Sequence, residues 1–128
     1  MYINKHVALF AYHYHKIISS ENFLDKEKLI LKTYANNYGI NISNIESPYF
    51  LPKFVKPNFN SNLYFLYYLH LTVVNNFSTN DYYKGFLIDY CAKVGFCRNT
   101  SVKELSEYLI ECAIQKKHFE EVLKSITI

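Results

Sequence analysis

His70 is the residue with the clearest potential for acid–base chemistry, because histidine titrates near neutral pH. It falls on an apolar helical face with Leu63, Leu66 and Tyr67. A buried histidine needs a partner for each ring nitrogen, and burial depresses its pKa. His70 is therefore either a catalytic base or pH switch, or a core histidine. We favour a core histidine hydrogen-bonded to one of the 13 tyrosines.

The motif "HYH" at 13–15 has the residue types of a metal chelator but not the spacing. Side chains two apart on a helix point about 200° away from one another. The helical pattern places His13 beside the core face and His15 in solvent, while His6 lies two turns from His13. We interpret all three as ordinary surface histidines rather than as a metal site.

The three cysteines Cys91, Cys97 and Cys112 have no CxxC spacing and are odd in number, which argues against a disulfide framework. Cys91 and Cys112 lie on predicted core faces and are interpreted as buried, inert thiols. Cys97 follows a glycine and precedes Arg98, a neighbour that lowers a thiol pKa. No oriented histidine is evident for it, so a Cys–His catalytic pair is not predicted.

Paired carboxylates occur mainly at predicted helix starts. Asp25 and Glu27 open one helix and Asp81 opens another, where the helix dipole favours acids. The chain contains no P-loop, GxGxxG, HExxH, GxSxG or EF-hand spacing, and it has three glycines. We therefore expect neither an enzyme nor a bound cofactor.

The most unusual segment is "SPYFLPKFVKPNF" at 47–59, which holds all three prolines. Aromatic rings beside lysines are able to stack on single-stranded nucleic acid, and exposed aromatics equally anchor protein partners. A third interpretation is that the segment covers the core with its rings. We predict contact residues at Tyr49, Phe50, Lys53, Phe54 and Lys56.

A second candidate surface is the acidic stripe Glu104, Glu107 and Glu111, which share one side of a predicted helix. The alternative is an ordinary solvated helix face. Both surfaces suit a binding protein and neither resembles a catalytic constellation.

Apolar residues recur with helical period along almost the whole chain. The pattern predicts a first helical hairpin at 6–40, an irregular Pro/aromatic loop at 41–61 and a second hairpin at 62–96. A C-terminal helical region at 100–126 is either one long helix or two helices broken near Gln115. Asn22 or Asp25 is expected to cap the helix before Gly39, and Ser78 the helix before Gly95.

The two hairpins have matching features at an offset of 56 residues, such as Tyr34 with Tyr90 and Gly39 with Gly95. Duplication and the shared physics of helical hairpins both explain this match. We predict one all-α domain over residues 1–128, with the hairpins packed in pseudo-twofold symmetry and the C-terminal region closing the core.

Composition limits the functional classes. The net charge is +3, and among the 14 basic residues only Arg98 is an arginine, which disfavours sequence-specific DNA reading. No run of 18 apolar residues predicts a membrane span, and no signal-like segment opens the chain. A cytoplasmic protein with no membrane partner is expected, and the Asn, Lys and Ile usage is typical of an AT-rich bacterial or phage genome.

The paired hairpins, with acids before the second helix and glycine after it, resemble the tellurite-resistance TerB-like helical domains over residues 6–115. The turns that correspond to the family's acidic turn read "SSENFLDKE" and "NNFSTND", without its glycine. The resemblance implies a divalent-cation site, with Asp25, Glu27 and Asp81 in the place of the family's acids.

Our functional prediction is a non-enzymatic protein that binds another macromolecule, most directly a small protein-binding inhibitor. Such a protein acts by occlusion, as an immunity or phage and mobile-element anti-defence protein does. Two alternatives stay open, a TerB-like cation-binding stress domain and a nucleic-acid-binding protein that uses the loop at 41–61.

Overall fold

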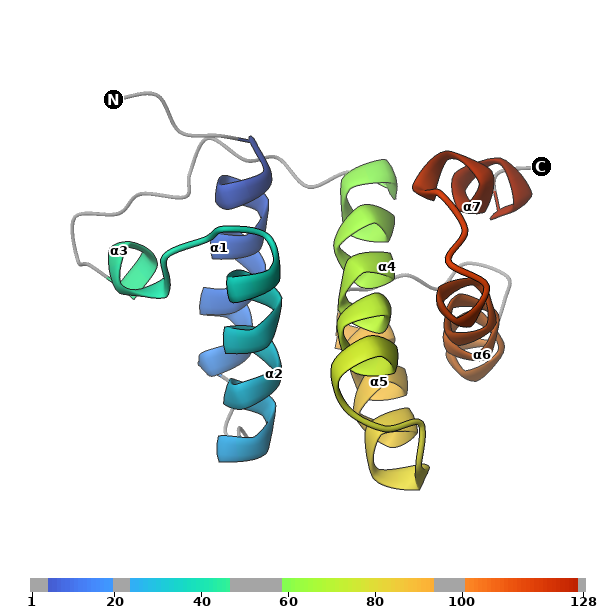
Figure 1. Cartoon of the computed structure of the whole chain (residues 1–128), viewed down its shortest axis with the longest axis horizontal. Coiled ribbons are helices and arrows are strands. Elements are labelled where there is room, and N and C mark those ends of the chain that lie inside the picture. Colours follow the sequence, from blue (N-terminus) through green and yellow to red (C-terminus); the bar gives the residue numbers. More distant parts are fainter. Residues whose placement is uncertain (1–4, 20–23, 47–58, 94–100, 127–128) are drawn as a thin grey trace. The chain divides into compact units, whose positions relative to one another are not determined.

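The computed structural model describes residues 5–19, 24–46, 59–93 and 101–126. These residues form seven α-helices and no strand (Figure 1), so the predicted all-α class is confirmed, with α3 as a helix that the sequence did not predict. The chain divides into two compact units, Met1–Pro57 and Asn58–Ile128. The pseudo-twofold packing of the hairpins stays a prediction. The helices are α1 (Lys5–Ile18), α2 (Asp25–Asn37), α3 (Ile42–Glu46), α4 (Phe59–Asn76), α5 (Asp81–Lys93), α6 (Val102–Ile114) and α7 (Phe119–Ile126).

In the first unit, α1 and α2 run antiparallel as a hairpin (Figure 1). Aromatic rings join the two helices, with the Phe10 and Tyr34 rings stacked at a centroid distance of 5.0 Å. The predicted apolar faces are confirmed by burial of the following residues: Phe10, Ala11, Tyr14 and Ile17 on α1, and Ile30, Leu31, Tyr34 and Ala35 on α2. Each large side chain that leaves water in this way contributes about 1.5–3 kcal/mol.

The start of α2 differs from the predicted cap. Leu24 is the N-cap residue, so Asp25 lies in the first turn instead, and Asn22 is outside the described residues. The Glu27 carboxylate accepts the Leu24 backbone N–H at 3.4 Å. Glu27 therefore supplies one half of a capping box, whereas the apolar Leu24 side chain accepts no N–H of the first turn.

The end of α2 confirms the predicted glycine stop. Gly39 has φ +67°, the left-handed region that favours glycine. The Ile40 N–H donates to the Ala35 carbonyl at 2.8 Å, and the Gly39 N–H to the Asn36 carbonyl at 3.4 Å. These two bonds form a Schellman motif, which turns the chain sharply away from the helix.

The segment after this turn is partly helical, whereas the sequence predicted an irregular loop from 41. The short helix α3 places Ile45 out of solvent. The His15 Nε2–H on α1 donates to the Ile45 carbonyl at 2.9 Å. That hydrogen bond therefore links α3 to α1, an interaction with no local signal in the sequence.

In the second unit, α4 packs against α5, α6 and α7, and it runs antiparallel to α5 (Figure 1). The helix begins at Phe59, three residues before the predicted start. Its predicted face is buried at Leu63, Leu66, Tyr67, His70 and Val73. Phe65, Leu69 and Thr72 are also buried, so α4 lacks the single apolar stripe that the sequence predicted.

The start of α5 is capped by Asn80 rather than by Ser78. The Asn80 Oδ1 accepts the Tyr83 N–H at 3.2 Å, and the Ser78 hydroxyl accepts the Asn80 N–H at 3.1 Å. Asn and Ser are both good caps, so the sequence alone did not place the helix start within two residues. The predicted buried residues of α5 are confirmed at Phe86, Leu87, Tyr90 and Cys91.

The C-terminal region forms two helices, because the first of them ends at Ile114 and a turn follows. Lys116 has φ +54°, and the Lys117 N–H donates to the Cys112 carbonyl at 3.1 Å. This is a second Schellman motif, with lysine where glycine is usual. The Tyr67 hydroxyl of α4 donates to the Lys117 carbonyl and holds the turn in place. Burial, the largest cause, raises the pKa of Tyr67 to about 12.

Candidate functional site

His70 and Ser106 form a buried polar pair between α4 and α6. The His70 Nδ1 lies 2.6 Å from the Leu66 carbonyl, and its Nε2 lies 2.9 Å from the Ser106 hydroxyl. A carbonyl only accepts, so Nδ1 carries the proton and Nε2 accepts from the serine. The predicted tyrosine partner is therefore wrong. Ser106 was missed, although it sits within the apolar pattern of α6.

A serine hydroxyl bonded to a histidine Nε2 has the geometry of a nucleophile with its general base. Here both side chains have 0% exposure, so a substrate has no route to the hydroxyl in this arrangement. Burial lowers the His70 pKa to about 4, so the imidazole is neutral at physiological pH. The pair satisfies two polar groups inside the helical packing, and it links α4 to α6.

The histidines of α1 differ from the predicted surface residues. His13 is only 2% exposed, and His15 is half-buried with its hydrogen bond to α3. His6 stacks on Tyr34 at 6.0 Å and meets the Tyr38 ring edge at 5.6 Å. Desolvation by burial lowers the His6 pKa. All three rings serve packing in the first unit.

The acids at the helix starts have local structural roles. Glu27 accepts the Leu24 N–H, while Asp25 and Asp81 are each the first residue of their helix. Asp25 and Asp81 belong to different units. Within the described ranges, no group of three or more His, Cys, Asp or Glu side chains is arranged to hold a metal ion. The cation site stays a prediction without structural support.

Other predicted residues divide by whether the structure describes them. Cys91 and Cys112 are buried thiols outside any disulfide, as predicted. Cys97 and the predicted loop contacts fall outside the described residues; these contacts are Tyr49, Phe50, Lys53, Phe54 and Lys56. No helix in the described part of the chain is long and apolar enough to cross a membrane.

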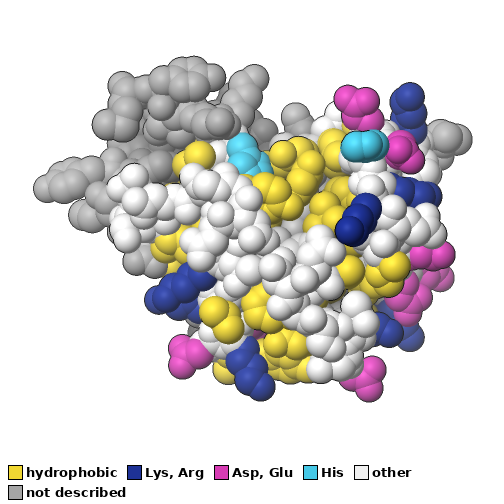
Figure 2. Space-filling model, in the orientation of Figure 1, with side chains coloured by type: hydrophobic (Ala, Val, Ile, Leu, Met, Phe, Trp, Pro, Cys, Tyr) yellow, Lys and Arg dark blue, Asp and Glu magenta, His cyan; other side chains and the backbone are white. Residues whose placement is uncertain are grey.

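The acidic stripe is the predicted surface that the structure does describe. Glu104, Glu107 and Glu111 are exposed on α6. None of the three carboxylates forms an ion pair within the described residues. Ile114, three residues beyond Glu111, is 60% exposed and continues the same helical line. We name these four residues the α6 face. Figure 2 shows Asp and Glu side chains (magenta) gathered where α6 and α7 lie.

The side of α6 opposite the α6 face is buried, so the α6 face points away from the core of the second unit. Leu105, Leu109, Cys112 and Ala113 are buried, and this apolar side packs against α4 and α5. The Ser101 hydroxyl accepts the Glu104 N–H at 3.1 Å, which caps the helix as predicted. In the middle of the helix, Tyr108 of α6 hydrogen-bonds to Ser125 of α7. The carboxylates therefore project from a helix that is held along its length.

Comparison with models of protein families, with curated proteins and with solved structures finds no match to this chain. Function is therefore inferred from the chemistry of the described surfaces.

Proposed function

We propose that this protein is a non-enzymatic protein-binding domain, and that the α6 face binds a basic surface of a partner protein. The observation that carries the proposal is a single helical line of three carboxylates, which have no ion pair among the described residues, and the line ends in an exposed isoleucine. The mode of action that suits such a face is inhibition by occlusion, in which α6 covers a basic site that the partner needs.

Electrostatics supports a basic partner. Like charges at i,i+3 and i,i+4 on a helix repel one another and cost stability, and no ion pair among the described residues offsets that repulsion here. Lysine and arginine side chains of a partner relieve that repulsion and accelerate encounter, most strongly at low salt. The chain as a whole carries a net charge of +3, so the acidic face is a local feature rather than a property of the composition.

Ile114 supports protein rather than a small cation as the occupant. An isoleucine at 60% exposure offers apolar area next to charges, which is the arrangement of an interface centre beside its polar rim. A bound metal ion uses carboxylates and has no use for this side chain. Nucleic acid is disfavoured at this face because its phosphates repel the glutamates.

The test is capture of partners from host lysate with tagged protein, followed by reconstitution with the purified partner. The test variant is Glu104→Gln, Glu107→Gln and Glu111→Gln in one chain, which keeps side-chain size and removes three charges. The charge-matched control is Asp25→Asn, Asp81→Asn and Asp89→Asn, since all three of these acids are exposed.

We expect a basic partner that wild type and control bind alike and that the test variant binds at least about tenfold more weakly. Ile114→Ala should weaken binding by about 1 kcal/mol or more, and added salt should slow association. A partner retained equally by wild type and test variant would contradict the proposal. So would a captured species that is nucleic acid.

A further inference from the structure

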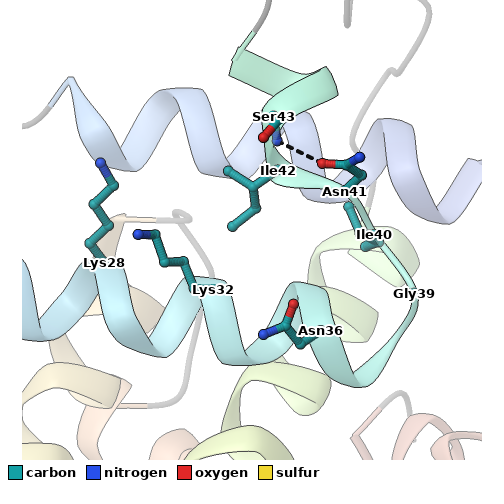
Figure 3. A pocket seen from close by; sticks show the side chains of 8 residues that line it. All are labelled: Lys28, Lys32, Asn36, Gly39, Ile40, Asn41, Ile42 and Ser43. Atoms are coloured by element: carbon teal, nitrogen blue, oxygen red, sulfur yellow. Dashed lines mark hydrogen bonds between the residues drawn. The ribbon is translucent and has the colours of Figure 1, made fainter.

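A polar groove lies in the first unit, along α2 and the turn that leads into α3 (Figure 3). Its volume is about 570 Å³, within the range of roughly 300–1,000 Å³ typical of small-molecule sites. The residues that line it are Lys28, Lys32, Asn36, Gly39, Ile40, Asn41, Ile42 and Ser43. None of the individually predicted site residues and none of the α6 face lines the groove, although Asn41, Ile42 and Ser43 belong to the predicted loop at 41–61.

The groove has one helical wall and one wall made of the turn. Lys28, Lys32 and Asn36 follow one another at intervals of four residues, so they share one side of α2. The opposite wall is held by the Ile40 N–H bond to Ala35 and by the Asn41 Oδ1, which accepts the Ser43 N–H at 3.0 Å. A site with fixed walls loses little entropy when a ligand binds.

The charges of the groove have one sign. Two lysine ammonium groups approach it from α2, and none of the described residues that line it carries a carboxylate (Figure 3). Neither the Lys28 nor the Lys32 ammonium group has an ion-pair or hydrogen-bond partner in the described part of the chain. Two uncompensated cations side by side repel each other, and a shared anion removes that repulsion.

We propose that this groove binds a small phosphate-bearing molecule of nucleotide size. Lys28 and Lys32 contact the phosphate oxygens, as lysines do at many phosphate sites. The Asn36 and Asn41 amides and the Ser43 hydroxyl offer donors and acceptors for the uncharged part of the ligand. Ile42 presents an apolar side chain between the two walls, on which a flat ring system can rest (Figure 3).

The experiment is isothermal titration of the full chain with inorganic phosphate, pyrophosphate and ADP. We expect ADP to bind more tightly than pyrophosphate, and pyrophosphate more tightly than phosphate, with dissociation constants below about 1 mM for ADP. Lys28→Gln with Lys32→Gln should weaken ADP binding at least about tenfold. The matched control is Lys84→Gln with Lys124→Gln, two exposed lysines of the second unit, and it should bind as wild type does.

Asn36→Ala separates the contributions of charge and of the amide. It should weaken ADP binding and leave pyrophosphate binding unchanged, because the amide faces the uncharged part of the ligand. Three outcomes would overturn the proposal: no binding of any probe at about 1 mM, equal ADP binding by wild type and the Lys28/Lys32 variant, or displacement of ADP by a single-stranded RNA that binds far more tightly. The last outcome would assign the groove to nucleic acid.

Discussion

The buried His70–Ser106 pair makes the sharpest prediction about stability. Ser106→Ala removes the proton that, among the described residues, is directed at Nε2 of the fully buried His70. A buried acceptor without a donor costs about 1–3 kcal/mol, so the free energy of unfolding should fall by that amount. In a His70→Leu background the acceptor is already absent, and Ser106→Ala should then cost less than about 1 kcal/mol.

The same pair predicts a specific pH dependence. The His70 pKa falls from 6.5 in the unfolded chain to about 4 in the folded chain. Below pH 6.5, His70 binds a proton in the unfolded chain but not in the folded chain. The contribution of neutral His70 to the free energy of unfolding is therefore fully present above pH 6.5 and decreases as the pH falls toward 4. At about 1.4 kcal/mol per pKa unit, the loss is about 3 kcal/mol.

Urea denaturation of wild type, both single variants and the double variant between pH 7 and 4 measures both effects. The carboxylates titrate alike in wild type and His70→Leu, so their difference isolates the histidine. Equal pH slopes in the two proteins would refute the assignment of a neutral, buried His70. Additive costs of the two substitutions would refute the hydrogen bond between them.

The two Schellman turns predict opposite effects of substitution at their left-handed residues, to be measured as midpoints of thermal and urea unfolding. Gly39→Ala should destabilise by about 1 kcal/mol, since a Cβ disfavours φ +67°. Lys116→Gly should stabilise by about 0.5–1 kcal/mol, because the lysine Cβ is already strained at φ +54° and glycine removes that strain. Stability changes of the same sign for the two substitutions would contradict the turn geometry. Tyr67→Phe should cost about 0.5–1.5 kcal/mol by removing the donor to the Lys117 carbonyl. If the Tyr67 hydroxyl instead faces water, Tyr67→Phe should leave the free energy of unfolding unchanged.

Helices and their apolar faces were predictable because the helical period of the apolar residues and the capping residues both depend on residues that are close together in the sequence. The buried face of α2 and the stop at Gly39 are examples. The exposed stripe Glu104, Glu107 and Glu111 was predictable for the same reason, since the three residues share a helical register, whereas the exposed Ile114 was not predicted. The predicted contacts at Tyr49, Phe50, Lys53, Phe54 and Lys56 lie outside the described residues and stay predictions.

What the sequence did not predict depends on contacts between distant residues. His15 hydrogen-bonds to the carbonyl of Ile45, 30 positions further along the chain, and His70 hydrogen-bonds to Ser106, 36 positions further along. No feature of the neighbouring sequence marks these partners. His15 was therefore interpreted as solvent-exposed, and a tyrosine was predicted as the hydrogen-bond partner of His70. The lysine groove was missed because its second wall depends on the turn after Gly39, where the sequence suggested an irregular loop.

Photo-crosslinking from the α6 face in the native host tests the central proposal most directly. A photoreactive phenylalanine analogue replaces Ile114 in one protein and Leu29 in another, since both side chains are largely exposed, at 60% and 54%. Our account predicts a covalent adduct with a basic protein from position 114 alone. That adduct should disappear when Glu104, Glu107 and Glu111 are changed to glutamine. Adducts from position 29 alone, or a position 114 adduct that persists without the three carboxylates, would contradict the account.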